Sequence, residues 1–116
     1  MRFLVLLASP DHFDRWDAAD EEEREAAFAA YRAFGQAVRE RGTLLLGDAL
    51  HRPDTARTVG PGDARPVTDG PFAETVEQLG GFYLVDLPDH ATAVELAKLL
   101  PDDCSVEVRP VLEVDF

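Results

Sequence analysis

The sequence predicts an α+β domain in which a four-stranded antiparallel sheet carries two helices on one face. Strand-like and helical segments alternate along the chain, with a polar hairpin inserted between the two halves. The 116 residues suffice for a single hydrophobic core, so we expect one domain over residues 1–116. Hydrophobic residues make up 46% and charged residues 29%, which is the usage of a globular chain.

The first half of the chain begins with a strand and a long helix. Residues 2–8 form a nearly continuous apolar run of strand length, typical of a strand covered on both faces. A helix is predicted over about residues 21–41, because Asp20 and Glu23 have the spacing of a capping box. Apolar side chains recur along it at steps of four, three and four residues: Ala27, Tyr31, Phe34 and Val38.

A second strand and a hairpin follow the helix. Residues 43–46 predict the strand, which we expect to end at Gly47. The next segment is polar and interrupted by glycine and proline. Residues 55–59 and 65–68 are interpreted as two short arms of a hairpin that turns at residues 61–63.

The second half repeats the order of strand, helix and strand. Residues 80–87 are the most strand-like segment, because they are rich in aromatic and β-branched side chains. Asp89 is the expected N-cap of a helix that ends at Pro101. Its core face would be one of two sets, Val94, Ala97 and Leu100, or Leu96, Leu99 and Leu100. Residues 105–109 alternate cleanly and predict the last strand, with residues 111–116 as a candidate extension.

These elements, joined by right-handed crossovers, predict the ferredoxin-like order β-α-β-hairpin-β-α-β, which leaves one sheet face without a helix. The segment 80–87 has apolar side chains on both faces, with Phe82 and Leu84 opposite Tyr83, Val85 and Leu87. Each apolar face of the sheet must be shielded from water, and the two predicted helices shield only one. A second copy packed sheet to sheet would shield the other, so a homodimer is expected. An open ligand cleft is the alternative, and both can hold together.

Charge and cysteine content exclude several classes of function. The formal net charge is −12, from 11 lysines and arginines against 23 aspartates and glutamates. Such a surface repels phosphate backbones and anionic lipid, so neither nucleic acid nor a membrane is an expected partner. The single cysteine, Cys104, cannot form an internal disulfide. The apolar run at residues 1–8 is too short to span a membrane and has no signal-peptide pattern, which predicts a cytoplasmic protein.

The segment 68–81, TDGPFAETVEQLGG, carries the most specific pattern in the chain. Asp69 and Gly70 before Pro71 are residues typical of a rigid turn. The segment resembles the YCII-related family, in the branch named for its Asp-Gly-Pro-Phe motif. The resemblance covers nearly the whole chain, since LLLGDAL before the hairpin and the closing VEVRP also match. It implies a ferredoxin-like domain that dimerises into an α/β barrel. Some relatives are implicated in dehydrochlorination of aromatic intermediates, and others are associated with sigma-factor proteins.

The motif also supplies the candidate catalytic residues. Asp69 and Glu74 are interpreted as a general acid–base pair, because neighbouring carboxylates raise one pKa toward the working range. The structural alternative is that Asp69 caps its own turn, while Glu74 and Gln78 satisfy loop backbone groups. Asp48 ends the second strand and either joins the same pocket or remains an exposed carboxylate.

Two further residues are candidates for substrate binding together with Gln78 and Asp48. Tyr31 would position the substrate from the first helix, or pack in the core with its hydroxyl at the edge. Relatives outside the branch carry a helix histidine proposed to pair with an aspartate. Tyr31 occupies that place and this helix has no histidine, so that dyad does not carry over. Arg109 on the last strand would balance negative charge or form a plain salt bridge.

No metal or cofactor is expected, because the three histidines have no ligand spacing with one another or with Cys104. His12 could bind a metal together with Asp11 and Asp14, but a polar loop is the favoured interpretation of this stretch. Three functions stay open. The first is a cofactor-independent small-molecule enzyme that performs proton transfer or elimination at a carboxylate-lined pocket. The second is a non-catalytic ligand-binding or regulatory module. The third is a protein-interaction partner of a transcription factor, recruited through the acidic residues 17–25.

Overall fold

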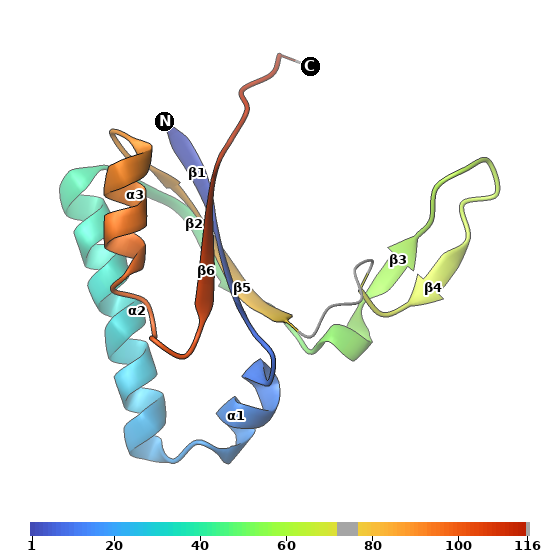
Figure 1. Cartoon of the computed structure of the whole chain (residues 1–116), viewed down its shortest axis with the longest axis horizontal. Coiled ribbons are helices and arrows are strands. Elements are labelled where there is room, and N and C mark those ends of the chain that lie inside the picture. The colour runs from blue at the N-terminus through green and yellow to red at the C-terminus, as the bar shows by residue number, and fades with distance from the viewer. Residues whose placement is uncertain (72–76, 116) are drawn as a thin grey trace.

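The computed structural model describes residues 1–71 and 77–115. Its elements are β1 (Arg2–Ser9), α1 (His12–Ala18), α2 (Glu21–Arg41), β2 (Thr43–Ala49), a 3-10 helix η1 (Pro53–Thr55), β3 (Arg57–Val59), β4 (Val67–Asp69), β5 (Gln78–Asp86), α3 (His90–Ala97) and β6 (Ser105–Pro110). β2, β5, β1 and β6 form, in that order, one antiparallel sheet (Figure 1). The expected α+β fold with a ferredoxin-like arrangement is confirmed.

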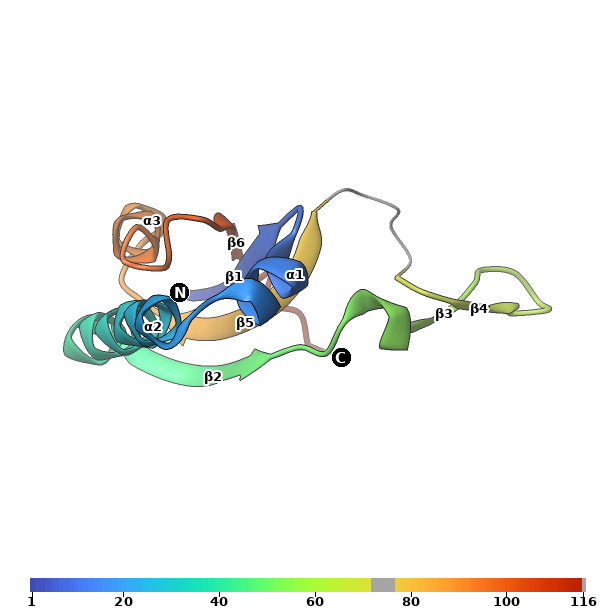
Figure 2. The ribbon, with the colours of Figure 1, turned by 90° about the horizontal axis from the view of Figure 1, so that it is seen from below.

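The hydrophobic core lies between the sheet and the helices α2 and α3 (Figures 1 and 2). Every second side chain of β1 is buried, and Phe3 and Val5 have no exposed surface. Phe3 pairs across the ladder with Val85 and Val5 pairs with Tyr83, so these side chains share the face toward the helices. The helices contribute the buried side chains Phe34, Val38 and Ala93, and the turn after α3 contributes Leu100.

The opposite face of the sheet is also apolar, as the sequence predicted for β5. Phe82 pairs with Leu6, and Leu84 pairs with Leu4, so these four side chains alternate away from the buried core residues. All four are partly buried. Leu46, on the neighbouring strand β2, pairs with Leu84 and is 46% exposed. An apolar stripe of five residues therefore runs across the face that carries neither α2 nor α3.

The helix α2 has the bounds and the cap that the sequence predicted. The Asp20 carboxylate accepts a hydrogen bond from the Glu23 backbone N–H at 2.8 Å, and the Glu23 carboxylate accepts one from the Asp20 backbone N–H at 3.3 Å. Phe34 and Val38 on its apolar stripe are buried, while Tyr31 is partly buried. Within the described part of the chain, no helix has the length and apolar composition that crossing a membrane requires.

Replacement of Asp20 by alanine should lower the free energy of unfolding by about 1 kcal/mol, because the first turn of α2 loses a side-chain acceptor for its free N–H groups. Urea denaturation followed by circular dichroism measures this loss. Replacement of Glu22, which lies in the same turn outside the capping box, is the matched control and should cost less. Equal losses for the two variants would contradict a stabilising role of the cap.

The helix α1 corrects the sequence analysis, which placed a polar loop around His12. Asp11 makes no side-chain cap bond, so the helix lacks a strong local start signal. Contacts from distant residues hold it instead. The Phe13 backbone N–H donates to the Gln78 side-chain oxygen at 3.4 Å, and the Arg15 guanidinium pairs with Asp103 at 3.2 Å. A seven-residue helix that depends on contacts with distant residues cannot be predicted from the local sequence pattern.

Three further features differ from the sequence analysis. β2 runs past Gly47, because this glycine pairs with Tyr83 and leaves room for its ring rather than ending the strand. The buried face of the helix α3 and the turn after it consists of Ala93, Ala97 and Leu100, which matches neither predicted set, because Val94 and Leu99 are each 43% exposed and Ala93 takes the core position. Residues 111–115 form no strand, and only the Val111 backbone N–H continues the pairing, donating to the Arg2 carbonyl at 2.9 Å.

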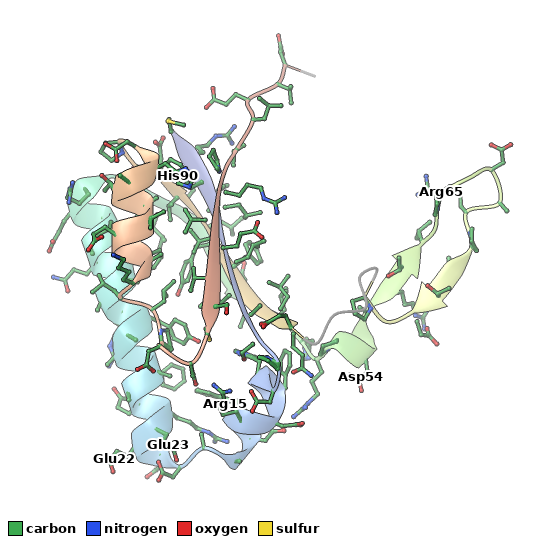
Figure 3. All side chains as sticks on the ribbon, viewed as in Figure 1. Arg15, Glu22, Glu23, Asp54, Arg65 and His90 are labelled. Atoms are coloured by element: carbon green, nitrogen blue, oxygen red, sulfur yellow. The ribbon has the colours of Figure 1, made fainter. Side chains whose placement is uncertain are left out.

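The predicted hairpin is present and projects from the sheet as an arm of β3 and β4 (Figure 1). It forms its own two-stranded sheet, in which Arg57 pairs with Asp69. The backbone N–H of Gly60 donates to the Pro66 carbonyl at 2.6 Å and closes the turn. Gly62 in that turn has a φ of 90°, which a residue without a side chain adopts at no steric cost. Figure 3 shows Arg65 on the arm and Asp54 on η1 at its base, both away from the main sheet.

Candidate functional site

A cavity of about 420 Å³ lies where α1 and α2 meet the ends of β2 and β5. We call it the outer cavity. Small-molecule sites have volumes of about 300–1,000 Å³, so this one is large enough for a ligand. Its described lining consists of Leu7, His12, Phe13, Trp16, Phe28, Tyr31, Gly47, Asp48, Ala49, Leu50, Gly80, Gly81, Phe82 and Tyr83. Aromatic rings come from both helices and from β5, although these elements are distant in sequence.

The imidazole of His12 is the one described nitrogen base in this lining. Its ring lies against the β5 backbone, because a Cβ atom on Gly80 would be 2.2 Å from its Nε2 atom. It also meets the ring of Phe13 edge to face, with the centroids 4.9 Å apart. Burial lowers the pKa of His12 from its ordinary value of 6.5, an effect that Asp103 opposes and Arg15 reinforces. The imidazole is therefore neutral at physiological pH and can accept a proton.

This pKa shift predicts how stability depends on pH. Because the folded-state pKa of His12 lies below 6.5, the unfolded chain binds more protons between those two values. The His12 contribution to the free energy of unfolding is therefore fully present above pH 6.5 and is lost as the pH falls through this interval. Urea denaturation of the wild type and of His12→Asn across this range measures it. The wild type should lose more stability on acidification, and parallel curves would contradict the shift.

Two tyrosines, Tyr31 and Tyr83, line the outer cavity. Burial raises the pKa of Tyr31 to about 12, and burial also raises the pKa of Tyr83. Both hydroxyls therefore keep their protons at neutral pH and can donate hydrogen bonds. The Tyr83 ring lies so close to β2 that a Cβ atom on Gly47 would be 2.5 Å from it. Its other neighbour is the buried ring of Phe34, with the centroids 4.9 Å apart.

Trp16 forms a fixed part of the wall between α1 and α2. Its indole meets Phe28 edge to face, with the ring centroids 5.4 Å apart. The Arg24 guanidinium lies 5.2 Å from the indole centroid and donates a hydrogen bond to the Trp16 carbonyl at 2.9 Å. This combination of ring packing, cation–π contact and hydrogen bond ties α1 to α2. Trp16 is also the single tryptophan of the chain, so its signals report on the outer cavity.

A second, smaller cavity of about 70 Å³ adjoins the first and is more polar. His12, Trp16 and Tyr31 line both. Arg15, which Figure 3 shows on the side of α1 that faces α2, lines only this inner cavity and pairs there with Asp103. Cys104 also lines it, and burial, with Asp103 beside it, raises the pKa of the thiol to about 11. The thiol is therefore protonated at neutral pH and is not an activated nucleophile.

The structure brings three of the sequence-predicted residues to the outer cavity or beside it. Tyr31 and Asp48 line it. Gln78 lies next to it at the start of β5, where its side-chain oxygen accepts the hydrogen bond from Phe13 that holds α1 against the sheet. These residues come from α2, β2 and β5, so the ferredoxin-like packing alone brings them together.

The other predicted residues lie elsewhere or outside the described chain. Asp69 is on β4, with its side chain 92% exposed and 3.9 Å from Arg57, and does not line the outer cavity. Arg109 pairs with Glu107 at 2.6 Å on β6. Glu74 lies outside the described residues, so its position relative to Asp69 is not described. The catalytic role of Asp69 and Glu74 stays a prediction.

Sequence reasoning missed His12 and the aromatic residues beside it. One signal was present, because Phe13 and Trp16 are apolar residues three positions apart within an acidic stretch. The relation between His12 and Gly80 left no such signal, since the two residues meet only after folding. In the described part of the chain, no group of three or more histidine, cysteine, aspartate or glutamate side chains is arranged to hold a metal ion.

The fold and this cavity define a small α+β domain with an aromatic site at one end of its sheet. The chain belongs to the YCII-related family, because the YCII-related domain model matches residues 1–115. It is also similar to an uncharacterized protein of Rhizobium meliloti (strain 1021), with 51% identity over 49 residues. That match covers 39% of this chain and 40% of the relative, so it spans less than half of either protein.

Proposed function

We propose that this protein is a small-molecule enzyme without a tightly held cofactor, and that His12 transfers a proton to or from a substrate in the outer cavity. One observation carries the proposal: a neutral imidazole, its pKa lowered by burial, faces an aromatic cavity of about 420 Å³. A general base must be unprotonated near the working pH and within reach of its substrate. His12 meets the first condition and lines the space in which a substrate would lie.

The inner cavity supports this proposal because it gives the base a way to exchange its proton. His12 lines both cavities, and the inner one contains the paired side chains of Arg15 and Asp103. Its volume of about 70 Å³ is sufficient for water, which needs polar partners of this kind. A proton taken from the substrate would leave the imidazole on this side without crossing the apolar lining.

The sequence-predicted residues keep proposed roles in this scheme. Tyr31 would donate a hydrogen bond to a substrate oxygen, and the Asp48 segment would border the substrate along β2. Gln78 would position α1 through its bond to Phe13. Asp69 and Glu74 remain the alternative acid–base pair, and this alternative requires a substrate to reach the arm from which Asp69 projects.

Deuterium exchange tests the proposed chemistry without a known product. The protein is incubated in heavy water with a panel of cyclic ketones, lactones and phenols, and mass spectrometry detects exchange at carbon. Wild type should catalyse exchange in at least one compound. His12→Gln should reduce that rate by about 10²- to 10⁴-fold, the range for loss of a general base. Asp69→Asn is the matched control and should leave it unchanged.

Two outcomes would contradict this assignment. An unchanged rate in His12→Gln together with a lost rate in Asp69→Asn would transfer the catalytic role to the motif. Tight binding of a compound with no exchange would favour a non-catalytic binding module. One observation favours the non-catalytic binding module: the described lining is mostly apolar. Its titratable residues are only His12, Tyr31, Asp48 and Tyr83.

We also propose that the chain belongs to the Asp-Gly-Pro-Phe branch of the family and works as a homodimer. The motif at residues 69–72 supports the branch. The apolar stripe across the second face of the sheet supports the dimer, because monomeric proteins rarely leave such a surface in water. Sedimentation velocity of Leu84→Lys should show monomers. Leu99→Lys, at a 43% exposed position on the helix side, is the control and should stay dimeric. A dimeric Leu84→Lys would contradict this interface.

A further inference from the structure

We infer that the outer cavity takes an uncharged, planar ring compound that carries a hydroxyl or carbonyl oxygen. This substrate class rests on the function proposed above and narrows it. Three properties of the cavity carry the inference. They are its aromatic walls, a described lining without lysine or arginine whose one carboxylate residue, Asp48, has its side chain directed to the other face of β2, and the presence of hydroxyl and imidazole groups.

The walls favour a ring. Phe13 and Trp16 on α1, Phe28 and Tyr31 on α2, and Tyr83 on β5 present aromatic side chains to the same space. The ring pairs within the wall are packed edge to face, which leaves ring edges and faces available to a ligand ring. Gly47 and Gly80 let the Tyr83 and His12 rings lie against the strands, so the space above them stays open.

The lining disfavours an anion. No lysine or arginine is among its described residues. Arg52 comes nearest, with its guanidinium 5.6 Å from the Phe13 ring centroid, but it pairs with Asp17 and lies 3.8 Å from Asp14. Arg15 pairs with Asp11 at 2.5 Å and with Asp103 at 3.2 Å. A carboxylate or phosphate in the cavity would be desolvated without a free cation, which is costly.

The lining also disfavours a cation. Asp48 is the one described carboxylate residue in the lining. Its neighbour Gly47 pairs with Tyr83, whereas Asp48 pairs with Phe82. Alternation along β2 therefore directs the Asp48 side chain to the same sheet face as Phe82, away from the face that carries Tyr83. On the side of the cavity that carries Tyr83, an ammonium group would therefore meet aromatic rings without this carboxylate, so an uncharged ligand is favoured there over both ions.

The polar groups that remain match an oxygen-bearing ring. Tyr31 and Tyr83 keep their hydroxyl protons, since burial raises both pKa values. Neutral His12 has one acceptor and one donor nitrogen. A hydroxyl or carbonyl oxygen can therefore receive a hydrogen bond from a tyrosine, while an acidic proton of the same ligand faces the imidazole. Apart from Asp48, no described residue of the lining is an aspartate, glutamate, lysine or arginine.

Three probes with one ring skeleton test the inference. These are naphthalenemethanol, naphthoate and naphthylmethyl-trimethylammonium, which are uncharged, anionic and cationic. Isothermal titration calorimetry measures each dissociation constant, and the indole N–H resonance of Trp16, the single tryptophan, places the probe in the outer cavity. The uncharged probe should bind at least about tenfold more tightly than either ion.

Each other outcome overturns the inference. Tighter binding of naphthoate would reveal a cationic site, and tighter binding of the ammonium probe would reveal a cation–π site. If either occurs while deuterium exchange at His12 persists, the substrate class is wrong and the proposed function stands. If none of the probes binds and no compound exchanges, both are wrong.

Two variants sharpen the test. Tyr31→Phe should weaken naphthalenemethanol about three- to tenfold through loss of one hydrogen bond, and should leave naphthalene itself unchanged. Asp14→Asn/Asp17→Asn removes the carboxylates that occupy Arg52 and should strengthen naphthoate binding specifically. A double variant that leaves the naphthoate affinity unchanged would show that pairing of Arg52 does not set the charge preference, which overturns that step of the inference.

Discussion

Phe34→Ala is expected to lower the free energy of unfolding by about 3–5 kcal/mol. The ring is 1% exposed and lies at the centre of the interface between α2 and the sheet, where it packs on Tyr83 with the centroids 4.9 Å apart. Truncation removes buried apolar surface and leaves a cavity that Val38 and Val85 cannot fill without moving the backbone. Urea denaturation at neutral pH measures the loss.

The same helix provides a matched control. Phe28 also lies on α2, but it is 45% exposed and borders the outer cavity rather than the core. Phe28→Ala should therefore cost about 1 kcal/mol, chiefly from its edge-to-face contact with Trp16. Similar losses for the two variants would contradict the division of α2 into a core end and a cavity end.

Gly80→Ala is expected to weaken binding of naphthalenemethanol by at least about tenfold while the domain still folds. The new methyl group would lie 2.2 Å from the Nε2 atom of His12, so the imidazole must leave its place against β5. The His12 side chain can move more readily than the strand backbone, and the displaced ring would occupy space in the outer cavity that the probe needs. Calorimetry with the Trp16 resonance measures the change, and urea denaturation verifies the fold.

Gly35→Ala is the control for this substitution. A Cβ atom on Gly35 meets only the end of the flexible Arg39 side chain, at 3.3 Å. The variant should bind the probe normally and gain up to about 1 kcal/mol of stability, because alanine is the better helix former. Unchanged binding in Gly80→Ala would show that the position of His12 does not shape the site.

Local patterns predicted most of the fold. The bounds and cap of α2 follow from Asp20, Glu23 and the apolar stripe, since a helix of this length contains its own start signal and core face. Asp89 is likewise the N-cap of α3, where it accepts a hydrogen bond from the Thr92 backbone N–H at 2.8 Å. The predictions failed where one residue type is compatible with two structures. Gly47 was expected to end a strand, but it lies within β2 and pairs with Tyr83.

The candidate site was predicted only in part. Tyr31 and Asp48 were named because a helix stripe and a strand end are visible in the sequence, and both line the outer cavity. His12 was interpreted as a loop residue, because the contacts that form α1 involve Gln78 and Asp103, far along the chain. The motif at residues 69–72 drew the prediction toward Asp69, which lies on the projecting arm.

By itself, the sequence determined the α+β class, the order of its main elements and the two apolar faces of β5. These properties depend on residues that are neighbours in the chain and repeat with the period of a helix or a strand. Only the tertiary structure decided that His12 lies on Gly80, that Tyr83 lies on Gly47, and that the aromatic rings of three elements enclose one cavity. Close contacts between distant segments have no local signature. A glycine that makes room for an aromatic ring cannot be distinguished in the sequence from a glycine that ends a strand.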